Sequence, residues 1–275
     1  MNKTALVFGS KGQDGSFICK SLLEKNYKVI GVSRSKNNIS NNHELLDIQK
    51  NIIYEISNIN NFKKVTDIIE TYQPDEIYNL AAQSSVSKSF RDPQETIKGI
   101  INGTLNLLEA SRGLGFSGRI FFAGSSEMFG NTEAGAEINH PHHPINPYAI
   151  GKQTSFNLVK LYREIYNLKC MTGVLFNHES SLRPKTFVTQ KIINTAKNIS
   201  KGNITILKLG NINVIRDWGW APEYVEAMQL IARSKVIKDH VICTGEANSL
   251  KKFVETVFRC FKLDWKKYTE IDDNL

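Results

Sequence analysis

Apolar runs and amphipathic stretches alternate along the first two thirds of the chain. Short runs rich in apolar and β-branched residues predict buried strands at 4–9, 27–33, 75–82, 118–126 and 170–177. The stretches between them predict helices near 17–26, 61–73, 95–113 and 148–166. Strands joined by helices in this order indicate a parallel sheet that helices cover on both faces. We therefore expect an α/β fold built on a doubly wound parallel sheet.

The pattern loosens after residue 177. An irregular segment precedes a helix near 187–201, and shorter strand-like runs alternate with helices near 219–234 and 249–262. We expect residues 1–177, with a returning segment near 211–245, to form the main domain. Residues 178–275 are expected to form mostly a smaller lobe, which is incomplete at its C-terminal end.

The composition is that of a globular protein, with 275 residues, 41% of them hydrophobic, and a formal net charge of +8. The charge admits an anionic small-molecule ligand, a compositional bias or nucleic-acid binding. We rank nucleic acid last because no basic run is interleaved with aromatic residues. The four cysteines show no paired spacing, so we expect reduced thiols in a cytoplasmic protein. No apolar stretch has the length of a membrane span, so no membrane partner is expected.

A glycine-rich turn follows the first predicted strand. The stretch "VFGSKGQDGS" contains Gly9, Gly12 and Gly15. In such a turn the first glycine permits a tight bend, the second lets the backbone approach a pyrophosphate, and the third allows close packing of helix on strand. The amino end of the helix then faces the phosphates. A purely structural turn is the alternative, but the place of the turn in an alternating chain favours a Rossmann-type, dinucleotide-binding fold.

The end of the second predicted strand bears on which dinucleotide is bound. An acidic residue there binds the ribose 2′-hydroxyl of NAD, whereas a cation accommodates the 2′-phosphate of NADP. The stretch "GVSRSKN" contains Arg34 and Lys36 and no acid. It predicts NADP in preference to NAD. The alternative is a solvated basic loop without a ligand.

The stretch "NPYAIGK" predicts the start of a helix that carries a tyrosine and a lysine. Asn146 can cap the helix, and Pro147 suits its first position. Tyr148 and Lys152 are four residues apart and would project from one face. An ammonium beside a phenol favours the phenolate, which is then a usable base. The alternative is a half-buried aromatic residue next to a solvated lysine.

The stretch "NHPHHP" contains His140, His142 and His143 and raises the question of a metal site. The prolines between the histidines prevent a helical face, and no acid or cysteine is spaced to complete a ligand set. We therefore expect a loop over an active site and no metal.

Short motifs spread over the whole chain are all consistent with one protein family. They read "GQDGS", "YNLAAQS", "GTLNLLEA", "SSEMFG", "NPYAIGK", "LFNHES" and "RDWGWAPEYVEAM". Through these stretches the chain resembles the extended short-chain dehydrogenase/reductase family, and within it most closely the GDP-mannose 4,6-dehydratase family. The resemblance implies an NADP-binding domain over 1–177, a substrate-binding lobe mostly over 178–275, and a homodimer or homotetramer.

The resemblance also implies an active centre made of Ser125, Glu127, Tyr148 and Lys152. Tyr148 as phenolate would remove the proton of the sugar 4-hydroxyl while a hydride leaves C4 for the nicotinamide, and Lys152 would hold the ribose. The resulting 4-ketone acidifies the C5 proton, which Glu127 would abstract. Water leaves from C6, and the hydride returns to C6. Ser125, which stands in the family's threonine position, would hydrogen-bond the oxyanion at O4.

Binding residues follow from the same motif-by-motif comparison. Implied contacts to the cofactor are Gly9, Gly12, Gln13, Asp14, Gly15, Arg34, Glu55, Leu80, Ala81, Gln83, Ser84, His178 and Arg183. Implied contacts to the nucleotide sugar are Ser85, Asn177, Glu179, Lys191, Gly210 and Arg216. The chain departs from the family at Ser85, where histidine is usual, and at Glu95, where tyrosine is usual.

The sequence thus predicts a lyase that converts GDP-mannose, or a related GDP-sugar, to its 4-keto-6-deoxy product. Two alternatives stay open. A nucleotide-sugar 4-epimerase or 4-reductase needs Tyr148 and Lys152 but not Glu127. A catalytically silent nucleotide-sugar binding protein would keep the pockets without the chemistry.

Overall fold

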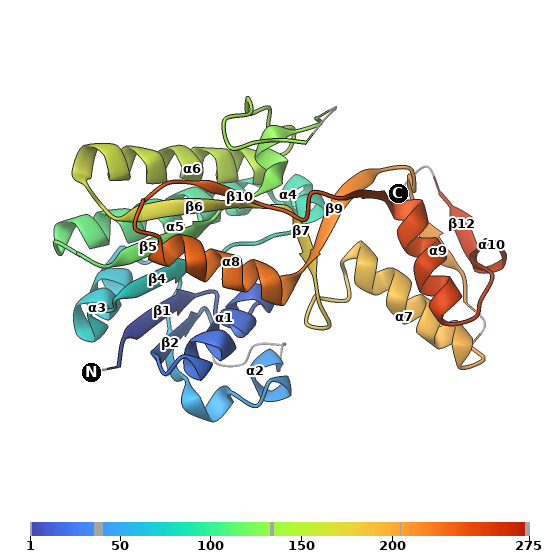
Figure 1. Cartoon of the computed structure of the whole chain (residues 1–275), viewed down its shortest axis with the longest axis horizontal. Helices are drawn as coiled ribbons and strands as arrows, with labels where there is room; N and C mark the ends of the chain where they lie inside the picture. Colours follow the sequence, from blue (N-terminus) through green and yellow to red (C-terminus); the bar gives the residue numbers. More distant parts are fainter. Residues whose placement is uncertain (1, 36–40, 133–134, 204, 273–275) are drawn as a thin grey trace. The chain divides into compact units, whose positions relative to one another are not determined.

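A computed structural model describes residues 2–35, 41–132, 135–203 and 205–272 (Figure 1). The described residues form two compact units. The first comprises Met1–Phe176 with Ala221–Ile242, and the second comprises Asn177–Trp220 with Cys243–Leu275. The returning segment of the first unit therefore consists of one helix and one strand.

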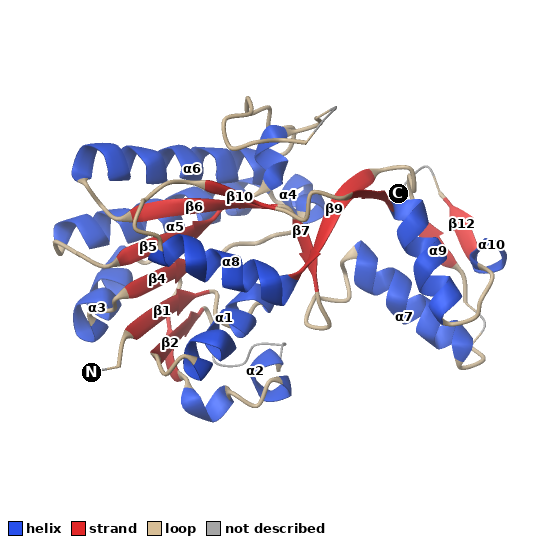
Figure 2. Cartoon of the chain, in the orientation of Figure 1, coloured by secondary structure: helices blue, strands red, loops and turns tan. Residues whose placement is uncertain are grey.

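The first unit alternates strands and helices as its hydrophobic pattern predicts (Figure 2). Its strands are β1 (Thr4–Phe8), β2 (Lys28–Ser33), β3 (Ile53–Ile56), β4 (Glu76–Asn79), β5 (Arg119–Ala123), β6 (Cys170–Leu175) and β10 (His240–Ile242). Its α-helices are α1 (Gln13–Glu24), α2 (Asn42–Leu45), α3 (Phe62–Tyr72), α4 (Val86–Arg91), α5 (Pro93–Gly113), α6 (Pro147–Tyr166) and α8 (Ala221–Arg233). Short 3-10 helices lie at η1 (Gln49–Asn51) and η2 (Ser126–Phe129).

The strands of the first unit form one sheet, in the order β10-β6-β5-β4-β1-β2-β3 among the described residues. Every pairing in it is parallel. The strand order reverses between β1 and β4, which is where open α/β sheets form ligand crevices at the carboxyl ends of their strands. The prediction of a doubly wound parallel sheet is confirmed.

Alternate residues of each strand pack against different helices, because successive side chains of a strand point to opposite faces. In β1, Ala5 and Val7 belong to the core that includes residues of α1 and α8. Leu6 and Phe8 belong to the core that includes residues of α3, α5 and α6. Each large apolar side chain buried in this way contributes about 1.5–3 kcal/mol. The continuous apolar runs seen in the sequence are therefore strands buried on both faces.

The second unit has its own core. Its elements are β7 (Asn177–Glu179), α7 (Val188–Ser200), β8 (Leu207–Leu209), β9 (Ile215–Trp220), β11 (Ala247–Ser249), α9 (Leu250–Cys260), α10 (Trp265–Tyr268) and β12 (Thr269–Ile271). The strands pair as β11-β9-β7 and as β12-β8. Ile192 of α7 and Val254 and Phe258 of α9 are fully buried at the centre.

Some elements differ from the sequence prediction. Strand β3 was not predicted, and it lies at the edge of the sheet with Ile53, Tyr54 and Ile56 all exposed. The strand predicted over 75–82 ends at Asn79, where the chain turns away toward α4. Helix α1 begins at Gln13, inside the predicted turn.

Within the part of the chain that the structure describes, none of the helices combines the length and the apolar character that a membrane-spanning helix needs.

Candidate active site

The glycine turn joins β1 to α1 and leaves no room for a side chain at Gly9 or Gly15. Gly9 has a φ of +80°, and a Cβ at this position would lie 2.7 Å from the carbonyl oxygen of Leu80. A Cβ on Gly15 would collide with the carbonyl oxygen of Gly9. Gly12 is exposed and caps α1, and the amino-terminal end of a helix is a favourable place for an anion. A backbone cradle without side chains fits the pyrophosphate of a dinucleotide.

Two residues of this turn that are predicted to bind the cofactor contact each other. Gln13 is buried, and its Nε2 donates to Oδ1 of Asp14 at 3.0 Å. The charge of Asp14 also acts on Lys152 of α6, where it favours the ammonium form. The glycine turn and the Tyr148–Lys152 helix are therefore electrostatically coupled within the first unit.

Helix α6 presents the tyrosine–lysine pair as its sequence predicts. Asn146 caps the helix by accepting from the backbone N–H of Ala149 at 2.8 Å, and Pro147 occupies the first position. Tyr148 and Lys152 are both buried, and the Lys152 Nζ lies 5.7 Å from the centroid of the Tyr148 ring. Burial lowers the pKa of Lys152 to about 8, and the charge of Asp14 acts in the opposite direction.

The end of β5 places Ser125 and Glu127 beside this helix. Ser125 is buried and caps η2, because its Oγ accepts from the backbone N–H of Glu127 at 3.3 Å. The Glu127 Oε2 accepts from Nδ2 of Asn146 at 2.9 Å. The Lys152 Nζ donates to the carbonyl oxygen of Ala123 at 2.6 Å. Strand β5 and helix α6 are thus joined at two points, and the four candidate catalytic residues lie at this junction.

Asn146, which the sequence predicts only as a helix cap, also contacts the candidate residue Glu127. The spacing of "NPYAIGK" signals the cap but not the second contact, because Glu127 is 19 residues away along the chain. The contact appears only once β5 and α6 pack together.

The remaining cofactor candidates of the first unit make contacts of their own. Arg34 forms an ion pair with Glu95 at the start of α5, with 3.8 Å between NH1 and Oε1, and both side chains are exposed. Lys36 lies outside the described residues. Glu55 of β3 accepts from the Tyr72 hydroxyl at 2.6 Å.

The segment after β4 supplies the other candidates of the first unit. Leu80 packs against Gly9 through its backbone and is followed by the half-buried Ala81. Gln83 donates to the Ser85 carbonyl at 2.9 Å, Ser84 is exposed, and Ser85 caps α4. Ser85 therefore has a structural role as the cap of α4, independent of any contact with a ligand.

The candidates from residue 177 onward lie in the second unit. Asn177, His178 and Glu179 form β7, and the Glu179 carboxylate accepts from Thr189 at 2.7 Å and pairs with Arg183 at 3.4 Å.

The last three substrate candidates also lie in this unit. Lys191 of α7 donates to the Lys208 carbonyl at 2.5 Å, and Gly210 follows β8. Arg216 is exposed, and NH1 donates to the Ile215 carbonyl at 2.8 Å. Lys191, like Arg216, is exposed, and Gly210 is half-buried.

The histidine-rich stretch packs against aromatic rings. The ring of His142 lies 5.5 Å from that of Phe129 and 5.2 Å from that of Phe156. The backbone N–H of His143 donates to the Met128 carbonyl at 2.9 Å, which fixes the stretch to η2. Among the described residues, no group of three or more His, Cys, Asp or Glu side chains could hold a metal ion.

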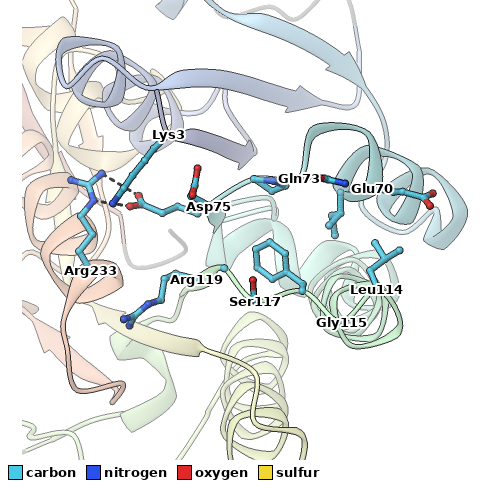
Figure 3. Close-up of a pocket in the computed structure, with 14 residues that line it drawn as sticks. Lys3, Glu70, Gln73, Asp75, Leu114, Gly115, Ser117, Arg119 and Arg233 are labelled. Atoms are coloured by element: carbon cyan, nitrogen blue, oxygen red, sulfur yellow. Dashed lines mark hydrogen bonds and ion pairs between the residues drawn. The ribbon is translucent and has the colours of Figure 1, made fainter. Parts of the chain in front are cut away.

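A separate pocket of about 720 Å³ lies at the opposite, amino-terminal edge of the sheet (Figure 3). Lys3, Asp75 and Arg119 line it where β1, β4 and β5 begin. Arg233 of α8 and Glu76 also line it, and Arg233 donates from Nε to the buried carboxylate of Glu76 at 2.9 Å. The Glu76 carboxylate also accepts from Tyr78 at 2.7 Å and from Tyr27 at 2.8 Å. These contacts tie α8 to the sheet, and the pocket lies away from the candidate site.

Comparison with known proteins gives the family. A sequence model of the GDP-mannose 4,6 dehydratase family matches residues 6–274. The chain is 40% identical over 284 residues to GDP-mannose 4,6 dehydratase 1 of Arabidopsis thaliana, over 98% of this chain and 78% of that protein. It is 38% identical over 265 residues to the GDP-mannose 4,6-dehydratase of Sinorhizobium fredii strain HH103, over 93% of this chain and 76% of that protein.

A solved structure shares the fold. It is DesIV, a dTDP-glucose 4,6-dehydratase from Streptomyces venezuelae crystallised with NAD and TYD bound. The TM-score is 0.87 at 19% identity, over 98% of this chain and 84% of that one. Because the family model and the relatives span nearly the whole sequence, the chain belongs to the GDP-mannose 4,6-dehydratase family.

Proposed function

We propose that this chain is a hydro-lyase that converts GDP-mannose to its 4-keto-6-deoxy derivative with a bound dinucleotide, NADP in preference to NAD. The observation that carries the proposal is the junction of β5 and α6. There Glu127 is hydrogen-bonded to the residue that caps the helix of Tyr148 and Lys152. A carboxylate beside a tyrosine–lysine pair is the set of groups that oxidation at C4 followed by elimination across C5 and C6 requires.

The cofactor binds at the glycine turn in this proposal. Gly9, Gly12 and Gly15 hold the pyrophosphate, and Arg34 meets the 2′-phosphate of NADP. The further contacts named for the cofactor and the sugar nucleotide above are proposed on the same family resemblance. When bound, the dinucleotide would supply hydride transfer away from C4 and back to C6, with no net redox change.

Tyr148 acts first, as the base that takes the proton of the sugar 4-hydroxyl. The buried Lys152 ammonium favours the phenolate form of Tyr148, and it is itself held by the Ala123 carbonyl. Ser125 donates a hydrogen bond to O4 while negative charge develops there. These three residues would assist the oxidation of C4 to a ketone, for which the bound dinucleotide would be the hydride acceptor.

Glu127 then acts on the ketone. The carbonyl at C4 acidifies the proton on C5, and the Glu127 carboxylate removes it. The C6–O bond breaks, the proton joins the departing hydroxide, and water is released. The double bond between C5 and C6 would be consumed when hydride is added at C6 and a proton is added at C5, and this proton balances the one that Tyr148 took from the 4-hydroxyl.

Purified chain incubated with GDP-mannose and NADP tests the proposal, with the product read by NMR. A 4-keto-6-deoxy sugar nucleotide is the expected result, and Tyr148→Phe is the control that should give none. Inversion at C4 with oxygen kept at C6 would instead show an epimerase. Tight binding without turnover would show a silent binding protein.

Two features stay predictions beside this function. A homodimer or homotetramer is expected from the family resemblance, and sedimentation of a monomer at micromolar concentration would contradict it. The cytoplasmic location, expected from the cysteine pattern, calls for fractionation of the source cells.

A further inference from the structure

Asn146 links the two halves of the candidate site through one side chain. It is only 5% exposed, and both ends of its amide are used. The Oδ1 accepts from the backbone N–H of Ala149 at 2.8 Å, and the Nδ2 donates to the Glu127 carboxylate at 2.9 Å. The residue that caps the helix of Tyr148 therefore also holds the proposed C5 base.

The chemistry of the two partners fixes the orientation of this amide. The Ala149 N–H can only donate, so it requires the oxygen of the Asn146 side chain. An ionised carboxylate can only accept, so Glu127 requires the nitrogen. Rotating the amide by half a turn would break both hydrogen bonds at once. Aspartate or serine at this position could keep the cap but would provide no amide nitrogen for Glu127.

The segment that carries Asn146 is held firmly against η2. The His143 N–H donates to the Met128 carbonyl at 2.9 Å, and Gly130, with a φ of +68°, lets the His143 carbonyl approach so closely that a Cβ would collide with it. Pro144 and Pro147 restrict the backbone on either side of Asn146. The segment therefore sets where the Asn146 amide lies relative to Glu127.

We propose that Asn146 is a positioning residue that aims the Glu127 carboxylate at C5 and so serves elimination but not oxidation of C4. The proposal rests on the proposed function. Oxidation depends on Tyr148 and Lys152, whose places are set by α6 and by the Ala123 carbonyl, and these survive when only the amide nitrogen is lost. Elimination depends on the direction of a carboxylate, and misplacement by about 1 Å can cost about 100-fold in rate.

The test uses two substitutions that keep the helix cap. Asn146→Ser replaces the amide nitrogen that reaches Glu127 with the hydroxyl of a shorter side chain. Asn146→Asp is nearly isosteric but sets a second carboxylate against Glu127. The matched control is Asn61→Ser, because Asn61 caps α3 by accepting from the Lys64 N–H at 3.1 Å, as Asn146 caps α6. Single-turnover reactions with GDP-mannose and NADP follow the two steps separately, by absorbance of the reduced nicotinamide and by NMR of the 4-keto-6-deoxy product.

We expect both Asn146 variants to form product about 10- to 100-fold more slowly, while nicotinamide reduction stays within about twofold and reduced cofactor accumulates. Thermal stability should match that of Asn61→Ser, which should turn over at the parental rate. Product formation at the parental rate in either Asn146 variant would overturn the proposal, and so would equal slowing of both steps. If Asn146→Ser does not fold, Asn146→Asp decides by the same readouts. If the parental chain itself makes no 4-keto-6-deoxy product, the proposed function fails and this inference fails with it.

Discussion

Lys152 donates from Nζ to the carbonyl oxygen of Ala123 at 2.6 Å, so an ammonium on α6 is fixed to the last residue of β5. The carbonyl supplies one hydrogen bond but no negative charge. Burial therefore lowers the pKa of Lys152 to about 8, even though the charge of Asp14 favours the ammonium. A lysine in this state acts as a fixed donor beside Tyr148 rather than as a solvated surface charge.

This depressed pKa predicts a pH-dependent stability. The unfolded chain keeps Lys152 protonated up to the ordinary value of 10.5, whereas the folded chain releases the proton at about 8. Between these pH values the unfolded state binds more protons, so the free energy of unfolding rises with pH. The protein should gain stability between pH 8 and 10.5 relative to Lys152→Met, by about 1–3 kcal/mol in all. Urea unfolding at several pH values measures this, and a constant difference between the two proteins would contradict it.

The ion pair of Arg34 with Glu95 predicts that substitution of either residue changes the affinity for NADP. The pair is exposed and is worth at most about 1 kcal/mol, so a 2′-phosphate can displace Glu95 from Arg34. Glu95→Gln should therefore tighten NADP binding by up to about fivefold, because the pair no longer competes. Arg34→Ala should weaken NADP binding by about tenfold or more.

Calorimetric titration with each dinucleotide measures both effects. NAD serves as the control ligand, because it lacks the 2′-phosphate and its affinity should not change. Equal affinity of the parental chain for NAD and NADP, unaltered in Arg34→Ala, would remove the prediction.

The contact between Arg233 and Glu76 lies far from the candidate site. It predicts that losing Arg233 lowers the free energy of unfolding by a large amount. Burial raises the pKa of Glu76, but hydrogen bonds from Arg233, Tyr78 and Tyr27 outweigh it and hold the pKa below its ordinary value. Arg233→Met would leave a buried carboxylate without its charge partner and should cost about 3–5 kcal/mol. Lys20→Met is the control, because Lys20 pairs with Glu24 on the surface and should matter by less than about 1 kcal/mol.

The sign of the pH dependence at this site follows from the lowered pKa. The contribution of Glu76 is present above the pKa of the unfolded chain and is lost as pH falls through the folded value. The difference in stability between the parental chain and Arg233→Met should therefore be largest at neutral pH and should narrow as Glu76 becomes protonated at acid pH. Chemical denaturation of the two proteins at neutral and acid pH tests this, and a difference that stays constant over this range would count against it.

Local signals in the sequence sufficed for the glycine turn and for α6. Gly9, Gly12 and Gly15 lie within seven residues of one another, and the Tyr148–Lys152 spacing is set by a single helical turn. The alternation of apolar runs likewise gave the parallel sheet. These features can be predicted from residues that are close together in the sequence.

Contacts between distant segments could not be predicted in the same way. Asn146 meets Glu127 and Arg34 meets Glu95 only because α5 and α6 pack on the sheet that contains β2 and β5. Strand β3 was missed because its four residues, "IYEI", show no alternation of apolar and polar positions. The roles of the site residues depend on ligands and stay predictions.

The most direct test of the account is a single-turnover reaction of Glu127→Gln with GDP-mannose and NADP. Glutamine keeps an oxygen for the Asn146 amide but cannot remove the C5 proton at a useful rate. We expect nicotinamide reduction to persist while the 4-keto-6-deoxy product falls by at least about 100-fold relative to the parental chain. Product formation at the parental rate would contradict the assignment of Glu127 as the base, and with it the account of a single site that oxidises C4 and then eliminates water.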